Sequence, residues 1–205
     1  MEALDLLIID IREESKMSKY KILALIGEAG SGKDTLMQRI LAKAPGLHEI
    51  ISCTTREPRE GEVHGKNYFF LTEEEFAQKV LNLEMLEATH KNWFYGTSID
   101  SLDESVVNIG VFNPDGIYAL LESPEVDLIP VYVRAKPKTR LLRQLNREEN
   151  PNVDEIIRRY GADKEDFEEF YFQHFIVDNE TEEDLDTAVN LILQLVGVIG
   201  DFGQK

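Results

Sequence analysis

The sequence predicts an α/β protein in which a parallel sheet is covered by helices on both faces. Short continuous apolar runs, typical of strands buried on both sides, alternate along the chain with stretches of helical spacing. Strands that alternate with helices indicate a parallel sheet. The chain has 205 residues, of which 42% are hydrophobic and 30% charged. This length and composition fit one domain with a buried core.

The N-terminal part divides into an extension and the first strand. Residues 1–16 carry no pattern that points to chemistry, and we expect this segment to be dispensable and the domain to begin at Met17. The apolar run KILALI at residues 21–26 predicts the first strand. Helical spacing follows over residues 34–44 and is stopped by Pro45.

Two polar segments, at 54–105 and at about 138–160, interrupt the alternation that follows. Residues 54–105 are polar and turn-rich, and a helix is expected inside them at 72–81, where Thr72 and Glu75 form a capping box. Segments inserted at the carboxyl ends of parallel strands usually build the binding site. The other expected elements are strands at 48–53, 105–112, 126–133 and 175–177, and helices from near Pro114, at 138–149, at 154–172 and from Thr181 to about Val196.

Composition limits the classes of partner. The 22 lysines and arginines face 39 aspartates and glutamates, which gives a formal net charge of −17. Such a charge disfavours general binding to nucleic acid or to an anionic membrane, although a few clustered arginines can still bind a small anion. The single cysteine, Cys53, excludes an internal disulfide and a thiolate zinc cluster. No apolar run approaches the roughly 20 residues of a membrane span, so we expect a soluble, cytoplasmic protein.

A glycine-rich loop lies between the first strand and the first helix. Its glycines and lysine have the Walker A spacing, in which backbone N–H groups surround phosphate oxygens and Lys33 adds a positive charge. The helix that begins near Lys33 directs its positive end to the same place. A glycine turn that merely precedes a lysine is the alternative. The expected ATP-binding residues are Gly27, Glu28, Ala29, Gly30, Ser31, Gly32, Lys33, Asp34 and Thr35.

The residue after the lysine departs from the Walker A pattern. A serine or threonine normally stands there and ligates magnesium, whereas this chain has Asp34 followed by Thr35. Because a carboxylate is a hard oxygen ligand, we expect Asp34 to hold Mg²⁺ directly or through water. The alternative is an acidic residue that only complements the helix dipole.

Two arginines in the polar insert are candidates for a second phosphate site. Arg56 and Arg59 lie three residues apart around a proline, and Tyr68 adds a hydroxyl from a later turn. Arginines in such an arrangement can bind one phosphate through bidentate hydrogen bonds. By spacing alone, the same segment fits an ordinary charged hairpin.

The insert resembles the guanylate kinases. Residues 52–70 match nearly every fixed position of the family pattern Ser-x-Thr-Thr-Arg-x-Pro-Arg-x-Gly-Glu-x-x-Gly-x-Asp-Tyr-x-Phe, with Asn67 in place of the aspartate. Glu84-Met85-Leu86-Glu87 and Tyr95-Gly96-Thr97 resemble two further family segments. The resemblance implies the fold of a P-loop nucleoside monophosphate kinase with a core at 17–53, 106–137 and 161–205, an acceptor-binding insert at 54–105 and a lid at about 138–160.

The resemblance also assigns residues to the acceptor. It implies that Arg56, Arg59, Tyr68 and Tyr95 bind the acceptor monophosphate and that Ser52, Glu87 and Thr97 read the base. Glu87 suits guanine because a carboxylate accepts hydrogen bonds from both the ring N–H and the exocyclic amino group. Without the resemblance, we would interpret Glu87 as a solvated acidic residue at the end of a helix.

Three arginines are candidates for the lid. Arg143 and Arg147 lie four residues apart, which would place them on one face of a helix, and Arg159 is a further candidate. The resemblance implies that such arginines bridge the donor and acceptor phosphates and neutralise the transferring group. The alternative is that they form surface ion pairs with Glu148, Glu149 or Glu155.

The chain departs from the family at the end of the central strand. The family has Asp-x-Asp-x-x-Gly there, for magnesium and guanine, whereas this chain has Val111 and Asn113 at the two aspartate positions. We therefore expect Asp34 to supply the missing acid. Asn113 remains a candidate ligand of the base, and other purine or deoxynucleotide acceptors stay open.

The expected activity is a guanylate kinase that uses ATP with Mg²⁺ to phosphorylate GMP or dGMP. The transferring phosphoryl group would be neutralised by Lys33, Arg56, Arg143 and Arg147. We expect the protein to act as a monomer or a homodimer, with no nucleic-acid or membrane partner. One alternative is a kinase of the same fold that acts on another nucleoside monophosphate or on a phosphorylated sugar. Another is a non-catalytic module of this fold that binds phosphopeptides.

Overall fold

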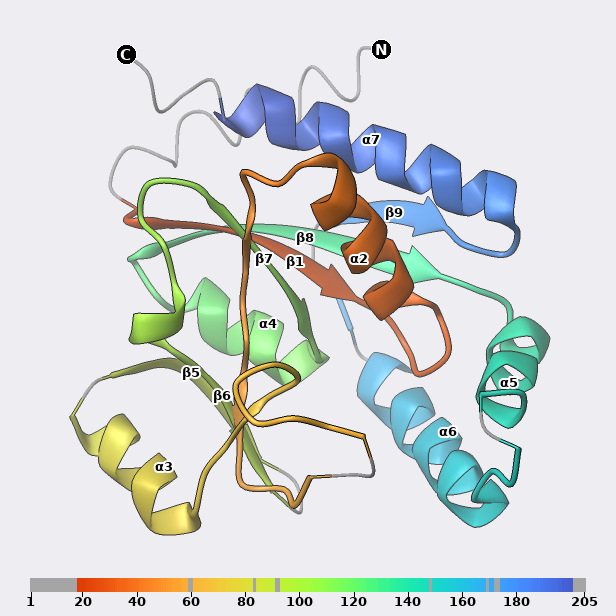
Figure 1. Ribbon diagram of the computed structural model, residues 1–205, viewed down its shortest axis with the longest axis horizontal. Coiled ribbons are helices and arrows are strands. Elements are labelled where there is room, and N and C mark those ends of the chain that lie inside the picture. Colours follow the sequence, from red (N-terminus) through yellow and green to blue (C-terminus); the bar gives the residue numbers. More distant parts are fainter. Residues whose placement is uncertain are drawn as a thin grey trace.

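The computed structural model describes residues 18–200 apart from 59–60, 83, 91–92, 148, 169 and 172–173, and the side chains of 86–90 and 198–200 lie outside this description. A five-stranded sheet and a four-stranded sheet are surrounded by helices (Figure 1). This arrangement confirms the predicted α/β class with a parallel sheet flanked by helices.

The five-stranded sheet is parallel throughout and has the order β2-β7-β1-β8-β9. At its centre, Ile26 at the end of β1 pairs with Phe112 of β7 on one side and with Tyr132 of β8 on the other. The carboxyl ends of the three central strands therefore lie at one edge. The strands are β1 (Tyr20–Ile26), β2 (His48–Glu49), β7 (Val107–Phe112), β8 (Val126–Arg134) and β9 (Phe175–Asp178).

Helices cover both faces of this sheet, which explains the continuous apolar run of β1. Figure 1 shows α2 (Lys33–Lys43) and α7 (Glu182–Gly200) together on one side and α4 (Pro114–Leu121) on the other. Leu23 and Leu25 pack in the cluster of α2 and α7, whereas Ile22, Ala24 and Ile26 pack in the cluster of α4. Because successive strand residues point to opposite faces, a strand buried on both faces needs apolar side chains at every position.

The four-stranded sheet belongs to the insert and has the order β4-β3-β6-β5. A helix, α3 (Glu73–Leu81), follows β4, and the capping box of Thr72 and Glu75 is confirmed. The prediction of a single strand over 48–53 is wrong, because the two ends of this segment pair in different sheets. His48 pairs with Asn108 of β7, and Cys53 pairs with Gly96 of β6. The strands are β3 (Cys53–Thr54), β4 (Phe69–Phe70), β5 (Met85–His90) and β6 (Phe94–Ser98), and a 3₁₀ turn, η1 (Ile99–Ser101), follows them.

Two helices, α5 (Pro137–Leu145) and α6 (Val153–Glu168), connect β8 to β9. The expected helix at 138–149 stops at Leu145, and α6 runs on past residue 160, where the lid was expected to end. Over the described part of the chain, no helix combines the length and apolar character that crossing a bilayer requires.

Candidate active site

The phosphate loop connects β1 to α2 and depends on glycines in two left-handed positions. Gly30 has φ +80° and Gly32, the N-cap of α2, has φ +93°. A Cβ atom at Gly30 would lie 2.5 Å from the carbonyl oxygen of Arg140. The backbone of α5 therefore packs directly on the loop, and only glycine fits there.

Lys33 folds back over this loop. Its Nζ donates to the carbonyl oxygens of Gly27 at 2.5 Å and Glu28 at 3.1 Å. Removal from water lowers the pKa of Lys33, while the nearby carboxylates of Asp34 and Asp163 act in the opposite direction. The ammonium group is thus held against the backbone of the loop.

Glu28 ties the loop to β8 and α5. One carboxylate oxygen lies 3.2 Å from Nη2 of Arg140, and the other accepts a 2.6 Å hydrogen bond from the hydroxyl of Tyr132. Burial and this hydrogen bond raise the pKa of Tyr132. Neither Arg140 nor Tyr132 belongs to a motif visible in the sequence, so only the structure reveals these anchors.

Carbonyl oxygens on the outer side of the loop are held by side chains from α5 and the loop after β9. Arg143 donates to the carbonyls of Gly30 at 3.4 Å and Ser31 at 3.2 Å, and the side-chain amide of Asn179 donates to Ser31 at 2.8 Å. Gln144 donates to Ala29 at 3.3 Å. The structure therefore brings Arg143 to the donor loop, where it holds the backbone.

The other two lid arginines do not share a face with Arg143. The expectation that Arg147 lies one helical turn after Arg143 was wrong, because α5 ends at Leu145 and Arg147 is exposed beyond it. Arg159 donates to Glu155 at 2.7 Å, which is the ion pair weighed as the alternative. Its neighbour Arg158 shares Glu155, and these contacts lower the pKa of that carboxyl group to about 2.

The acceptor cluster gathers around Arg56, whose side chain is buried in the insert with 6% of the residue exposed. The guanidinium donates to both carboxylate oxygens of Glu62, at 3.0 and 2.9 Å, and lies 5.5 Å from the ring of Tyr68. The rings of Tyr68 and Tyr95 lie 6.2 Å apart, edge to face. Burial opposes the charge on Arg56, but the bond to Glu62 outweighs it and raises the pKa of the guanidinium. Arg59 lies outside the described residues.

Asp34 in the first turn of α2 acts electrostatically on both the donor loop and the acceptor cluster. Its charge acts on Lys33 and on Tyr68, where burial, Tyr95 and Asp34 together raise the pKa of the phenol. Asp34 and Thr35 are both exposed in the first turn of α2. Arg158 also acts on this region, because its guanidinium interacts with Tyr95.

The candidate base-reading residues occupy one row across the smaller sheet. Glu87 pairs with Thr97, and Cys53 pairs with Gly96 in an antiparallel register whose next step sets Ser52 opposite Thr97. Ser52 is half-buried and Thr97 is fully buried. The side chain of Glu87 lies outside the described residues.

Asn113 has a structural task that the sequence did not reveal. It is the N-cap of α4, and its side-chain oxygen accepts a 2.8 Å hydrogen bond from the N–H of Gly116. An asparagine bonded in this way keeps its NH₂ group free to donate to a ligand. Asn113 could therefore both cap α4 and donate to a base.

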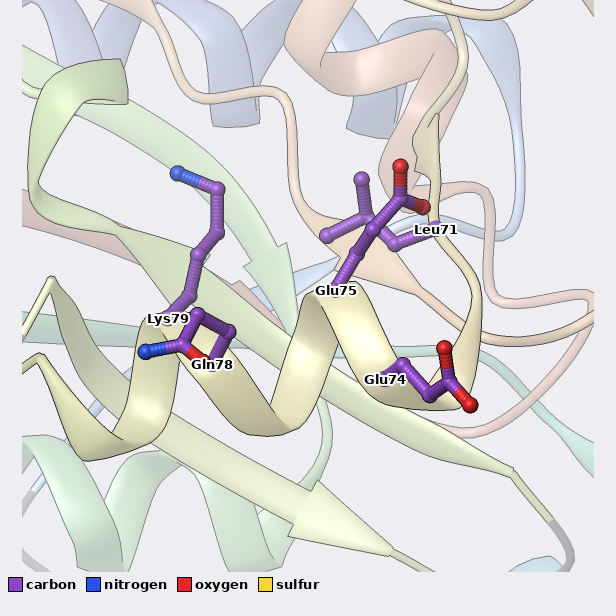
Figure 2. Close-up of a pocket in the computed structure, with 5 residues that line it drawn as sticks. All are labelled: Leu71, Glu74, Glu75, Gln78 and Lys79. Atoms are coloured by element: carbon purple, nitrogen blue, oxygen red, sulfur yellow. The ribbon is translucent and has the colours of Figure 1, made fainter.

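A hollow of about 450 Å³ lies beside α3 (Figure 2). Leu71, Glu74 and Gln78 line part of it, and two of its charged groups are already engaged: Glu75 in the capping box, and Lys79 with Glu84. Its acidic lining does not suit a phosphorylated ligand. Within the described part of the chain, no cluster of three or more His, Cys, Asp or Glu side chains could hold a metal ion alone.

Comparison with known proteins identifies relatives of one kind. Residues 19–195 match the family described as guanylate kinase. A guanylate kinase from Geobacter metallireducens is 34% identical over 170 residues, which cover 80% of this chain and 83% of that protein. Guanylate kinases from Prochlorococcus marinus (40% identical over 90 residues, 43% of this chain) and Trichodesmium erythraeum (44% over 82 residues, 40% of this chain) match over less than half of their own lengths, 49% and 44%.

The fold is also that of a known structure. The crystal structure of guanylate kinase from Anaplasma phagocytophilum superposes with a TM-score of 0.61 over 87% of each chain. The identity of 24% means that this likeness concerns the fold alone.

Proposed function

The chain belongs to the guanylate kinase family, and we propose that it transfers the γ-phosphoryl group of ATP to GMP or dGMP, giving ADP and GDP or dGDP. One observation carries the proposal: Asp34 at the phosphate loop is near enough to both Lys33 and Tyr68 of the acceptor cluster for its charge to act on each of them. Two phosphate-binding groups near each other are what an in-line transfer between two nucleotides requires.

The residues of the chain supply position and charge, and no covalent intermediate on the protein is needed. Lys33 and the loop amides would hold the outer phosphates of ATP, while Arg56, Tyr68 and Tyr95 would hold the acceptor phosphate. Positive groups on both sides neutralise the charge that spreads over the transferring phosphoryl group. Approach of the insert and the α5–α6 segment would exclude water, which otherwise competes as acceptor.

The base site supports guanine. Ser52, Thr97 and Glu87 occupy one row across the smaller sheet, so three polar residues would meet one edge of a base. A carboxylate at Glu87 would accept from the ring N–H and the amino group of guanine. The NH₂ group of Asn113 would donate to an acceptor atom of the same ring.

Magnesium fits the first turn of α2. Asp34 and Thr35 present hard oxygen atoms to solvent beside Lys33, and Mg²⁺ is typically held by one or two carboxylates together with waters and substrate phosphates. Asp34 and Thr35 would hold the ion, which would supply positive charge to stabilise the phosphate groups. We expect Asp34→Ala to raise the Mg²⁺ concentration needed for half-maximal activity about tenfold, and an unchanged titration would contradict this assignment.

A coupled assay of ADP release tests the proposed activity. The assay supplies ATP, Mg²⁺ and, in separate reactions, GMP, dGMP, AMP, dAMP, CMP, dTMP or UMP. We expect turnover with GMP or dGMP alone, and their ratio gives the sugar preference. Turnover with another nucleotide would mean that the base site recognises a base other than guanine. Binding of GMP without turnover of any acceptor would favour a non-catalytic binding module. We propose that the enzyme acts as a monomer or homodimer in the cytoplasm.

A further inference from the structure

Arg140 on α5 is buried beside the phosphate loop, with 6% of the residue exposed. Its guanidinium lies 5.3 Å from the centre of the Tyr160 ring, and its Nη2 lies 3.2 Å from the carboxylate of Glu28. The carbonyl of the same residue packs against Gly30. Arg140 is therefore fixed to the loop by both its backbone and its side chain.

Two of the nitrogens of Arg140 have nothing to bind. Nε and Nη1 are buried and have no hydrogen-bond partner among the residues that the structure describes. Buried donors, charged ones above all, are normally paired, because burial without an acceptor is unfavourable. Guanidinium N–H groups that lack an acceptor can donate charge-assisted hydrogen bonds to phosphate oxygens.

An anion from the protein already occupies the loop beside this guanidinium. The carboxylate of Asp163 on α6 accepts a 2.6 Å hydrogen bond from the N–H of Ala29, one of the amides expected to bind phosphate. Lys33 and Arg140 both act electrostatically on Asp163. The carboxylate of Asp163 thus binds the N–H of Ala29 and lies near the positive charges of Lys33 and Arg140, which a bound phosphate would also contact.

We propose that Arg140 is a further phosphate-binding residue of the donor site, and that the carboxylate of Asp163 occupies this subsite until the nucleotide displaces it. The inference rests on the proposed function, since it assigns the ligand of the same loop. The unpartnered N–H groups of Arg140 and the N–H of Ala29 would donate to phosphate oxygens of the donor. The residue is not part of the Walker A pattern or of the lid arginines expected from the sequence.

If Arg140 had a purely structural role, it would neutralise Glu28 and would bind no phosphate. Arg134 forms a bidentate ion pair in this protein, because its Nε and Nη2 both donate to Asp178, at 2.7 and 3.0 Å. Arg140 has no such second bond from Nε. Substitution by lysine separates the two roles, because a lysine keeps the charge opposite Glu28 but loses the additional N–H groups of the guanidinium.

Binding of inorganic tripolyphosphate, measured by calorimetry on the full chain, tests the inference without any acceptor nucleotide. We expect Arg140→Lys to weaken this binding at least tenfold while the melting temperature and GMP binding stay unchanged. Arg134→Lys is the matched control and should bind as the parent does. Asp163→Asn should strengthen binding at least threefold, because the competing charge is gone.

The outcomes separate this inference from the proposed function. Parent protein that binds tripolyphosphate but phosphorylates no nucleotide would contradict the proposed activity and leave the subsite intact. Equal binding by folded Arg140→Lys and the parent, or no binding by the parent, would overturn the subsite. If Arg140→Lys does not fold, Asp163→Asn decides the matter, and unchanged binding in that variant would overturn the inference.

Discussion

The donor loop and the acceptor cluster both provide a place for phosphate oxygens, but they are built in opposite ways. The donor loop is continuous in sequence and presents backbone N–H groups, so its function depends on glycine φ angles such as those of Gly30 and Gly32. The acceptor cluster brings together side chains from Arg56 to Tyr95 and depends on charge and ring contacts. The donor loop should therefore be sensitive to added atoms, and the acceptor cluster to lost charge.

The largest effect is expected in the donor loop. Lys33→Met removes the positive charge that lies against the loop, and we expect kcat to fall about 10³-fold, as for loss of one group that stabilises transition-state charge. GMP binding should be unchanged, because Lys33 contacts the donor loop and not the acceptor cluster. Steady-state kinetics and GMP calorimetry measure the two quantities, and retention of activity within tenfold would contradict this role.

The next prediction concerns charge in the acceptor cluster. Arg56→Met should raise the Kd for GMP about 100-fold, which corresponds to about 2.7 kcal/mol, and leave ATP binding unchanged. Glu62→Gln is the matched variant: it weakens the bidentate pair that orients Arg56 without removing the positive charge, so we expect a loss of about tenfold. Equal effects of the two substitutions on GMP binding would show that orientation, and not the guanidinium charge, decides affinity.

The donor loop should be more sensitive than the acceptor cluster to an added side-chain atom. A Cβ at Gly30 meets the carbonyl of Arg140 at 2.5 Å, and the residue has φ +80°, so Gly30→Ala should cost about 1–3 kcal/mol of folding free energy. Gly46→Ala is the control, because a Cβ there has nothing within 4 Å. Thermal unfolding should show a lower melting temperature for Gly30→Ala alone. Equal melting temperatures for the two variants would mean that α5 can move away from the loop.

The smallest effect is a pH dependence of the donor region without nucleotide. Burial raises the pKa of Asp163 above its ordinary value, although Lys33 and Arg140 oppose the shift and Glu28 adds to it. A raised pKa in the folded state means that stability is lost as pH rises through that pKa. Asp163→Asn should therefore melt slightly higher than the parent at pH 7, with a difference that shrinks toward pH 4. A difference that grows on acidification would contradict this sign.

The two regions also differ in how well the sequence predicted them. The donor loop was predicted residue by residue, because backbone binding of phosphate needs glycines and a lysine at fixed spacing in one segment. The pairing of residues in the acceptor cluster followed only from the family resemblance, since β3 and β6 are far apart in the chain. The row of Ser52, Thr97 and Glu87 is a property of sheet register, which no local pattern specifies.

The errors share a cause. The expected face shared by Arg143 and Arg147 failed because α5 ends at Leu145, and helix ends are weakly specified by local sequence. The strand expected at 48–53 contributes to two sheets because its partners, β7 and β6, come much later in the chain. The assignment of Asn113 to the base stays a prediction, and the structure adds that its oxygen caps α4.

The sequence by itself determined the α/β class, the strand–loop–helix element and the presence of a second arginine-containing site, because these depend on periodicity and on residues close in the chain. Only the tertiary structure decided that Glu28, Arg140 and Tyr132 form one network and that Asp163 reaches the amide of Ala29. The physical reason is the distance along the chain. Contacts between residues more than a hundred positions apart arise from how helices and strands pack, and packing is a property of the whole core.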